Sequence, residues 1–209
     1  MDLTALANEQ KDLAKLVRKY DDPSYTSPIV TGVDVAYAKD IAAGCAVVSN
    51  NYTKEIIDSS VIIKEIESDY IHGFFQLREG PIIIELIRSL EMQGIILVDG
   101  NGILHPRRFG LASYLGIKMD VQTIGVAKKL MLGEMGPGTG DSAEIIQDRE
   151  VLGKVLWLNE RKPIYVSIGH RITLDTAVKI VSESSVDGYP EVLRRAHKMS
   201  KEALNRYKD

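Results

Sequence analysis

The segment GIILVDGNGILHPRRFGLASYLGIKMDVQTIGVA, residues 94–127, contains two short apolar runs separated by a helix-like stretch. The runs at 94–99 and 121–127 have the length and the branched side chains of buried strands. Pro106 suits the first turn of a helix, which the sequence extends through about Ile117. A strand, a helix and a second strand in this order predict a parallel crossover. The segment therefore predicts an α/β fold.

Upstream of this segment, the sequence predicts three strands and a helix. The strand-like stretches are 29–37, 43–49 and 58–66, with a turn at 50–52. Three consecutive strands favour an antiparallel meander. Pro81 suits the first turn of the helix, which is predicted from the spacing of Ile83, Leu86, Ile87 and Leu90.

Downstream, the glycines at 133–142 predict a flexible loop. The stretches 151–158 and 163–169 are typical of a strand pair, and 174–184 and 190–207 are typical of two closing helices. The order of elements predicts a mixed sheet, with an antiparallel meander and parallel strands, flanked by helices.

The N-terminal residues 3–20 predict an amphipathic helix, and residues 21–28 predict a linker because they are rich in proline and serine. No linker within 29–209 is long enough to divide the chain, so we expect one domain over 1–209. The apolar face of the N-terminal helix would consist of Leu3, Leu6, Leu13, Leu16, Val17 and Tyr20.

The composition is that of a globular protein in a reducing compartment. Of 209 residues, 44% are hydrophobic and 26% are charged, and Cys45 is the only cysteine, so no intrachain disulfide can form. The N-terminus does not read as a signal peptide, and no run approaches the roughly 20 apolar residues that span a bilayer. We expect a cytoplasmic monomer. The net charge of −3 argues against a general nucleic-acid coat protein but permits a local basic groove.

Asp34 lies in the strand-like TGVDVAY between two very small residues, Gly32 and Ala36, which share its face of the strand. A charge inside a central strand is costly unless it is paired or binds a metal. An edge strand with a solvated aspartate is the alternative. The small neighbours leave room for an ion or a phosphate beside the carboxylate.

Two further carboxylates stand at element ends. Asp99 ends a strand flanked by crossover helices, where ligands of α/β sheets collect, although an ordinary Asp-Gly turn is also common. Glu79 precedes Gly80-Pro81 at a helix start, where an acid is favourable through the helix dipole alone. Together, Asp34, Glu79 and Asp99 offer the hard oxygen ligands of Mg²⁺ or Mn²⁺. The chain has no zinc-type spacing and no Walker motif.

Basic residues follow the ends of the same predicted strands. Each could be a solvated surface charge, but together they would form a phosphodiester clamp beside the carboxylates. His197 shares a helix face with Leu193 and Leu204, which also suits a buried core histidine. The basic group consists of His105, Arg107, Arg108, Lys128 and Lys129.

The ordered motifs TGVDVAY, LREGP, VDGNGILHPRRFGLAS, TIGVAK, SIGH and PEVLRRAH resemble the endonuclease V family over nearly all of residues 29–207. The resemblance implies a ribonuclease H-like fold. It implies that Asp34, Glu79 and Asp99 bind the metal, and that His197 completes the metal site.

The resemblance also implies substrate contacts. His105 and Lys128 match residues around the scissile phosphate and the substrate backbone, and Gly73 matches the glycine beside the base-recognition pocket. Arg78 is the neighbour of the metal-site glutamate. Tyr70 matches the tyrosine of a wedge that probes the strands, but here the wedge reads DYIH at 69–72 and lacks the two family prolines. Proline stiffens a loop, so this wedge is expected to be softer.

The function that the resemblance implies is Mg²⁺-dependent hydrolysis of a phosphodiester 3′ to a deaminated base (hypoxanthine/inosine), one nucleotide beyond the lesion, in DNA repair. Mn²⁺ is expected to substitute for Mg²⁺. Two alternatives stay open: an inosine-specific endoribonuclease that acts mainly on RNA, and a module that binds nucleic acid without cutting it. The three carboxylates argue against the binding module, because acidic side chains that face phosphate would not help a protein that only binds nucleic acid.

Overall fold

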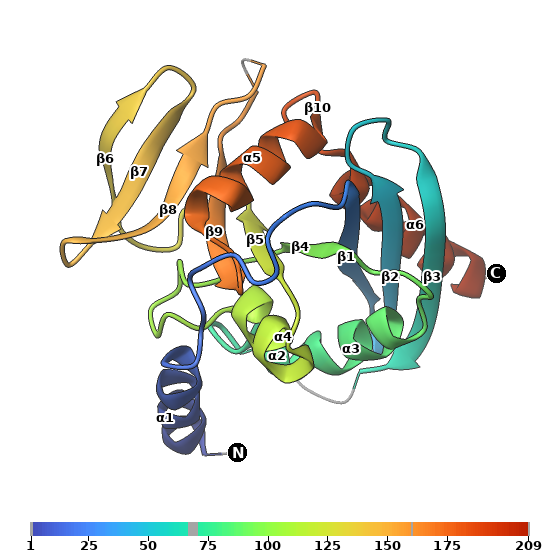
Figure 1. Cartoon of the computed structure of the whole chain (residues 1–209). Helices are drawn as coiled ribbons and strands as arrows, with labels where there is room; N and C mark the ends of the chain where they lie inside the picture. The colour runs from blue at the N-terminus through green and yellow to red at the C-terminus, as the bar shows by residue number, and fades with distance from the viewer. Residues whose placement is uncertain (1, 67–70, 160, 209) are drawn as a thin grey trace.

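The computed structural model describes residues 2–66, 71–159 and 161–208, and within them a nine-stranded mixed sheet forms the centre of the molecule (Figure 1). The order of strands is β3-β2-β1-β4-β5-β9-β8-β7-β6. A separate two-stranded ribbon, Ser185–Val186 with Tyr189–Pro190, connects the last two helices. The large strands are β1 (Ile29–Ala38), β2 (Ile41–Asn50), β3 (Ile56–Glu65), β4 (Ile95–Asp99), β5 (Thr123–Ala127), β6 (Glu134–Thr139), β7 (Ser142–Gln147), β8 (Glu150–Leu156) and β9 (Ile164–His170).

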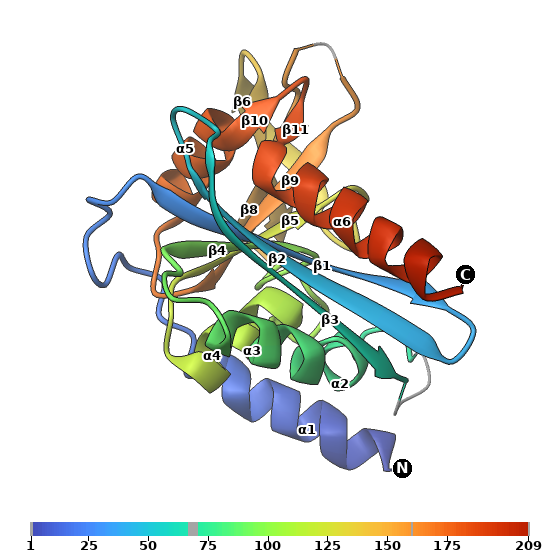
Figure 2. The same cartoon turned by 90° about the vertical axis from the view of Figure 1, so that its right-hand side faces the viewer.

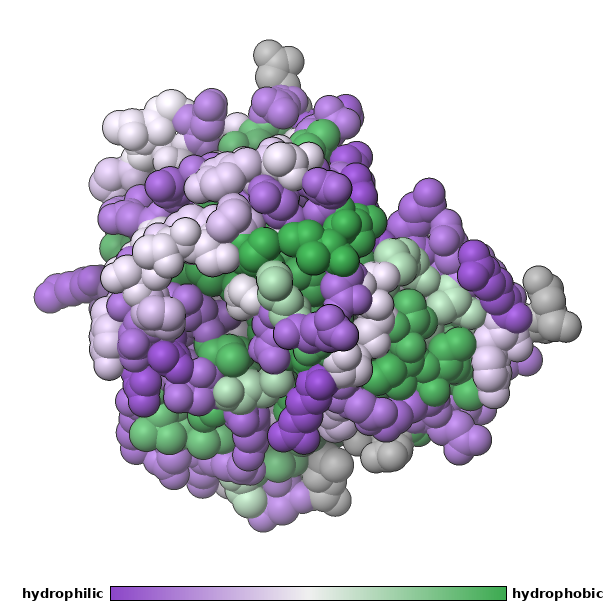
Figure 3. Space-filling model, turned by 45° about the vertical axis from the view of Figure 1, so that its right-hand side comes forward, coloured by the Kyte–Doolittle hydropathy of each residue, from purple (hydrophilic) through white to green (hydrophobic). Residues whose placement is uncertain are grey.

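The antiparallel meander predicted at the N-terminal side is confirmed. β1 pairs antiparallel with β2, and β2 pairs antiparallel with β3. The turn after β2 is closed by Asn50, whose Oδ1 atom accepts a 2.8 Å hydrogen bond from the backbone N–H of Tyr52. β3 is the edge strand, and its exposed apolar side chains are Ile56, Ile57, Val61 and Ile63. Hydrophobic patches interrupt the hydrophilic surface on the face drawn in Figure 3.

The parallel crossover is confirmed as well, because β1 pairs in parallel with β4 and β4 with β5. Its helix, α4 (Leu111–Met119), begins later than the sequence predicts. Arg108 has a φ of 55°, which no right-handed helix permits, so Pro106 lies in a loop instead. The loop also passes close to the sheet, since a Cβ atom on Gly102 would lie 2.0 Å from the carbonyl oxygen of Ile168.

The prediction of a flexible loop at 133–142 is wrong. These residues form β6 and the start of β7, which pair antiparallel. The turn lies at Gly140, whose φ of 59° favours glycine. Glycine and proline make up half of β6, and these residues are typical of loops, so composition did not predict that this segment pairs as a strand. The strand pair predicted downstream is confirmed as β8 and β9, which are antiparallel.

Helices cover both faces of the sheet (Figure 2). On one face, a short helix α2 (Phe75–Arg78), α3 (Gly80–Arg88) and α4 lie below β1, β2 and β4, where Val33, Leu86 and Leu115 share a buried cluster. On the other face, α5 (Leu174–Ser184) and α6 (Glu191–Lys208) pack on a second cluster around Leu97. The two predicted closing helices are thus confirmed.

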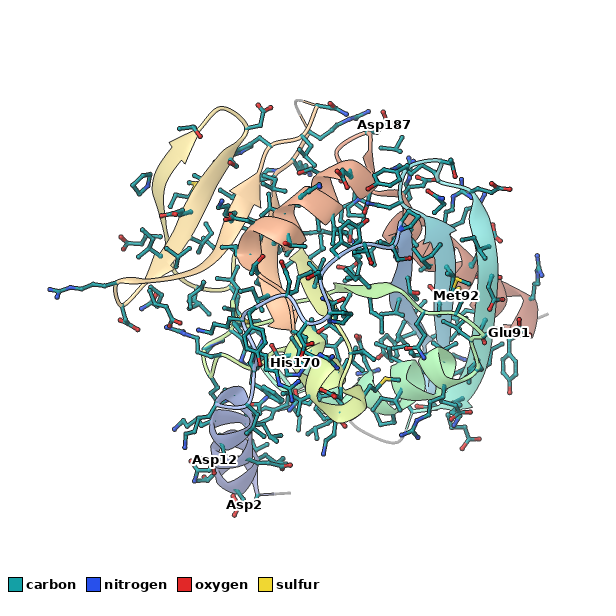
Figure 4. All side chains as sticks on the ribbon, in the orientation of Figure 1. Asp2, Asp12, Glu91, Met92, His170 and Asp187 are labelled. Atoms are coloured by element: carbon teal, nitrogen blue, oxygen red, sulfur yellow. The ribbon has the colours of Figure 1, made fainter. Side chains whose placement is uncertain are left out.

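The N-terminal helix is shorter than predicted and packs differently. α1 (Leu3–Ala14) ends before Leu16 and Tyr20, and these side chains are exposed, as is Leu3. Asp2, labelled in Figure 4, is the N-cap of α1 at its outer end, and its carboxylate accepts hydrogen bonds from the backbone N–H groups of Thr4 and Ala5. Leu6 and Leu13 are half-buried, so the predicted apolar face of α1 is only partly covered.

The stretch 21–28 contains no helix or strand, but hydrogen bonds join its first residue to the start of α5. The carboxylate of Asp21 accepts hydrogen bonds from the backbone N–H of Thr173 at 2.8 Å and from the hydroxyl of Thr176 at 2.7 Å. His170, labelled in Figure 4, accepts a 3.2 Å hydrogen bond at Nδ1 from the backbone N–H of Arg18. The single-domain organisation stays a prediction. None of the described helices is long and apolar enough to cross a membrane.

Candidate functional site

Asp34 and Asp99 lie side by side at one place in the sheet. The parallel register of β1 and β4 pairs Val33 with Val98, so the two aspartates are the next residues on adjacent strands. Their side chains are 11% and 21% exposed, respectively. The sequence predicted that the two aspartates lie close together, and the parallel register of β1 and β4 explains why they do.

The carboxylate of Asp34 faces α6. Its Oδ2 atom lies 3.0 Å from Nδ1 of His197 and accepts a 3.0 Å hydrogen bond from the hydroxyl of Ser200. α6 can lie this close because Gly32 has no side chain, and a Cβ atom there would lie 2.6 Å from the backbone of Val192. The His197 side chain is 44% exposed, so it is not a core histidine.

The carboxylate of Asp99 forms an ion pair with the ammonium group of Lys128. That ammonium also lies 4.8 Å from the ring centre of Tyr189, which is a favourable cation–π contact. The Tyr189 hydroxyl is buried beside the Asp99 carboxylate, and no hydrogen bond of good geometry joins it to a described residue. Burial, together with the nearby charges of Asp99 and Asp34, raises the pKa of this phenol.

Glu79 is the third carboxylate, and it precedes α3 on the opposite face of the sheet from α6. Burial, assisted by the charges of Asp34 and Asp99, raises the pKa of Glu79 to about 8. The Tyr37 hydroxyl opposes this by donating a 3.2 Å hydrogen bond to Oε1 of Glu79. The Arg78 guanidinium stacks 4.1 Å from the centre of the Tyr37 ring, which fixes the group beside the acid.

The three carboxylates suit a divalent cation in chemistry and in charge. They are hard oxygen donors, and burial of Glu79, assisted by the charges of Asp34 and Asp99, raises its pKa enough to favour the protonated acid at neutral pH. Within the described ranges, however, no three histidine, cysteine, aspartate or glutamate side chains converge closely enough to hold an ion as they stand. Asp34 and Asp99 are held by His197 and Lys128 instead.

A cavity of about 100 Å³ opens beside two of the carboxylates. Glu79 and Asp99 form part of its wall, and Gly73 lies opposite in the left-handed conformation, with a φ of 78°. The remaining lining is largely apolar or backbone, which suits a flat aromatic ligand. It consists of Phe75, Gln76, Gly100, Asn101, His105, Gly110, Leu111 and Met131.

His105 lines this cavity as a neutral ring. It is only 3% exposed, and burial, assisted by the charge of Arg107, lowers its pKa to about 4. A backbone hydrogen bond with Gly73 acts in the opposite direction. At neutral pH His105 can therefore donate or accept a hydrogen bond near a phosphate, but it brings no positive charge.

The two arginines of the HPRR motif have protein partners. Arg107 donates a 2.7 Å hydrogen bond from Nη2 to the carbonyl oxygen of Gly73. Arg108 points to the β7–β8 turn, where Nε donates a 3.2 Å hydrogen bond to Glu150 and Nη2 lies 3.7 Å from Asp148. The structure thus places Arg107 near the cavity and directs Arg108 away from it.

Lys128 and Lys129 are both exposed, so either lysine is accessible to a phosphate. The proposed wedge residues Asp69 and Tyr70 lie outside the described residues. Sequence reasoning missed four side chains that the structure brings into contact with the site residues, and these are Gln10, Tyr37, Tyr189 and Ser200.

A sheet of this order, with acids on its two central parallel strands, defines the ribonuclease H-like class of fold. Residues 11–198 match the family model described as endonuclease V. An endonuclease V from Dictyoglomus thermophilum is 38% identical over 202 residues, which cover 94% of this chain and 88% of that protein. One from Thermofilum pendens is 40% identical over 192 residues, covering 90% and 83%.

Solved structures agree with this assignment. The crystal structure of endonuclease V from Streptomyces avermitilis superimposes with a TM-score of 0.89 at 32% identity, and covers 98% of this chain and 94% of that one. Endonuclease V from Ciona intestinalis, in complex with a 24mer DNA containing an inosine followed by a ribo-adenosine, also gives 0.89, at 28% identity and 98% coverage of both chains. The chain belongs to the endonuclease V family. It is therefore an endonuclease that hydrolyses phosphodiesters, and this membership implies dependence on a divalent metal.

Proposed function

We propose that this protein cleaves nucleic acid 3′ to a hypoxanthine base, one nucleotide beyond it, and so starts the repair of deaminated DNA. The observation that carries the proposal is the position of the cavity, whose wall contains both Glu79 and Asp99. A base bound there lies next to the carboxylates, so recognition and hydrolysis share one site.

The cavity fits a single extruded base. An enzyme that inspects a base must turn it out of the stack into a pocket, where its faces are covered and its edge is read by hydrogen bonds. Phe75, Leu111 and Met131 supply apolar cover, while Gly73 and Gly100 leave backbone groups accessible. At about 100 Å³, the cavity is far smaller than the several hundred Å³ of pockets for drug-sized ligands.

Asp34, Glu79 and Asp99 are the residues that would hold Mg²⁺, with Mn²⁺ as a substitute. Bound there, the cation would lower the pKa of a water molecule and stabilise charge on the phosphoryl oxygens. The Tyr37 hydroxyl and the Arg78 guanidinium hold Glu79 in place, and both favour its charged form.

Lys128 and His197 complete the site from its open side. The Lys128 ammonium is positioned by Asp99 and by the Tyr189 ring, and at 52% exposure it can reach a phosphate. There it would stabilise the negative charge that develops in the transition state. His197 orients the carboxylate of Asp34 from α6, because its Nδ1 atom lies 3.0 Å from Oδ2.

An RNA-directed activity is the second candidate. The relative from Ciona intestinalis was solved with a strand in which a ribo-adenosine follows the inosine. A 2′-hydroxyl at that position distinguishes RNA from DNA. If this chain acts mainly on RNA, one ribonucleotide after the inosine should suffice for RNA-like cleavage.

The test compares matched strands with inosine or adenine at one position. The strands are all-DNA, all-RNA and DNA with one ribonucleotide after the inosine, each with Mg²⁺ or with EDTA. We expect inosine-dependent cleavage of DNA in Mg²⁺ only. Faster cleavage of RNA by an order of magnitude would establish the endoribonuclease instead, and binding without cleavage in Mg²⁺ and Mn²⁺ would contradict both.

A further inference from the structure

α1 is attached to the protein through an amide side chain. Gln10 is 2% exposed and is the only buried residue of this helix, all of which the structure describes. The leucine at the start of the helix is 46% exposed. Burial of an amide is unfavourable unless its polar atoms are hydrogen-bonded, so the partners of Gln10 explain why α1 docks where it does.

Gln10 uses both ends of its amide. Its Nε2 atom donates hydrogen bonds to the carbonyl oxygens of Gly73 at 3.2 Å and Phe109 at 3.3 Å. Its Oε1 atom accepts a hydrogen bond from Nε of Arg107. One side chain therefore joins α1 to two loops that are far apart in the sequence.

Arg107 also contacts the loop that contains Gly73. Its Nη2 atom donates a 2.7 Å hydrogen bond to the carbonyl oxygen of Gly73, and its guanidinium lies 4.3 Å from the centre of the Phe74 ring. Its backbone N–H donates a 3.3 Å hydrogen bond to Nδ1 of His105. The Gly73 carbonyl thus receives donors from both Gln10 and Arg107.

This carbonyl belongs to the wall of the cavity. Gly73 and His105 both line it, whereas Gln10 and Arg107 stand behind them and do not. A left-handed residue such as Gly73 has few local constraints of its own, because glycine is the most flexible residue. Its position must therefore be set by its partners.

We propose that Gln10 is a positioning residue for base recognition: through Arg107 and the Gly73 carbonyl, it holds the wall of the base cavity, which makes α1 part of the recognition machinery. This inference rests on the proposed function, since it concerns the same cavity. It assigns Arg107 to support of that wall and not to a phosphate contact. Loss of Gln10 should therefore weaken discrimination between bases more than it weakens hydrolysis.

The test uses Gln10→Met in the full chain, because methionine keeps the volume but cannot form these hydrogen bonds. Single-turnover cleavage is measured on an inosine strand and on the same strand with adenine, at increasing enzyme concentration. We expect the selectivity for inosine to fall about tenfold, as for the loss of a hydrogen bond to a charged partner. The slow cleavage of the adenine strand at saturating enzyme should stay unchanged. Asn8→Ala, on an exposed position of α1, is the matched control and should behave as wild type.

A double-mutant cycle with Arg107→Met separates positioning from simple loss of stability. If both side chains act through Gly73, the double variant should be no less selective than the worse single variant. If the methionine variant does not fold, Gln10→Glu replaces it in the same assay. This variant keeps the acceptor for Arg107 but loses the donor to Gly73 and Phe109, so it should also lose selectivity. Wild-type selectivity in a folded Gln10 variant, additive effects, or an equal loss on both strands would overturn the proposal. An absence of inosine-dependent cleavage by the wild type would instead refute the proposed function.

Discussion

The Nδ1 atom of His197 lies 3.0 Å from Oδ2 of Asp34, so a histidine near the C-terminus holds an aspartate of the first strand. The two residues are 163 positions apart in the chain. This pair joins α6 to β1 where the acidic residues of two parallel strands meet. The integrity of the site therefore depends on the docking of the last helix.

Asp34→Asn should reduce cleavage in Mg²⁺ about a thousandfold, because it removes a charge from the metal site at nearly constant volume. Single-turnover rates on an inosine strand provide the measurement, and circular dichroism checks the fold. Asp12→Asn, on the exposed side of α1, is the control for loss of one negative charge. Retained activity in a folded Asp34→Asn protein would remove Asp34 from the metal site.

Lys128→Ala should slow the chemical step about a hundredfold while binding changes little, if its ammonium acts on the transition state. Lys129→Ala is the matched control, because the adjacent lysine is exposed and has no ion pair with Asp99. Maximal single-turnover rates and affinities in Ca²⁺ separate the two effects. A change in affinity alone would show that Lys128 merely binds the substrate.

The stability of the metal-free protein should depend on pH through Glu79. Its folded pKa of about 8 is above the usual value of 4.5, so the folded state holds the proton more tightly than the unfolded state does. This contribution is complete below pH 4.5 and is lost as the pH rises through about 8. Glu79→Gln should abolish that component.

The measurement compares thermal midpoints of wild type and Glu79→Gln in EDTA, at intervals from pH 5 to pH 9. The difference between the two proteins should shift in favour of the glutamine variant as the pH rises. Metal affinity of the wild type should increase over the same range, because binding requires the carboxylate. A difference that does not vary with pH would mean that Glu79 keeps an ordinary pKa.

Tyr189→Phe should leave the thermal midpoint within about 2 °C of wild type, or raise it, because the buried hydroxyl makes no hydrogen bond of good geometry with its neighbour Asp99. The ring that contacts the Lys128 ammonium is kept. Tyr189→Leu removes that ring and should slow cleavage, as Lys128 loses its support. A large loss of stability in the phenylalanine variant would reveal a hydrogen bond to the hydroxyl.

Much of the fold follows from local patterns. The meander, the crossover and the closing helices each have a hydrophobic period that belongs to one type of element. The failures have physical reasons. The loop 100–110 is set by contacts with β9, which no local pattern reveals, and β6 is rich in residues that normally interrupt strands. The leucines of α1 suggested apolar packing, but the helix docks through Gln10.

The acidic part of the site was predictable from the positions of two residues. Asp34 lies inside a strand between small residues, and Asp99 ends a strand flanked by crossover helices. The partners of these acids were harder to foresee. Ser200 and Tyr189 are ordinary residues of a helix and a short strand, and only the tertiary fold brings them to the carboxylates. The phosphate contacts of the two arginines stay a prediction, and the protein partners that the structure gives both of them were not foreseen from the sequence.

The central claim is that the cavity and the carboxylates act on one phosphodiester next to a bound hypoxanthine. Its most direct test is to map, at single-nucleotide resolution, where the wild-type protein cuts a DNA strand that contains one inosine. The account predicts a single Mg²⁺-dependent cut on the 3′ side, one nucleotide beyond the inosine, and only slow background cleavage of the strand with adenine at that position. Cleavage at another bond, or equal cleavage of both strands, would contradict it.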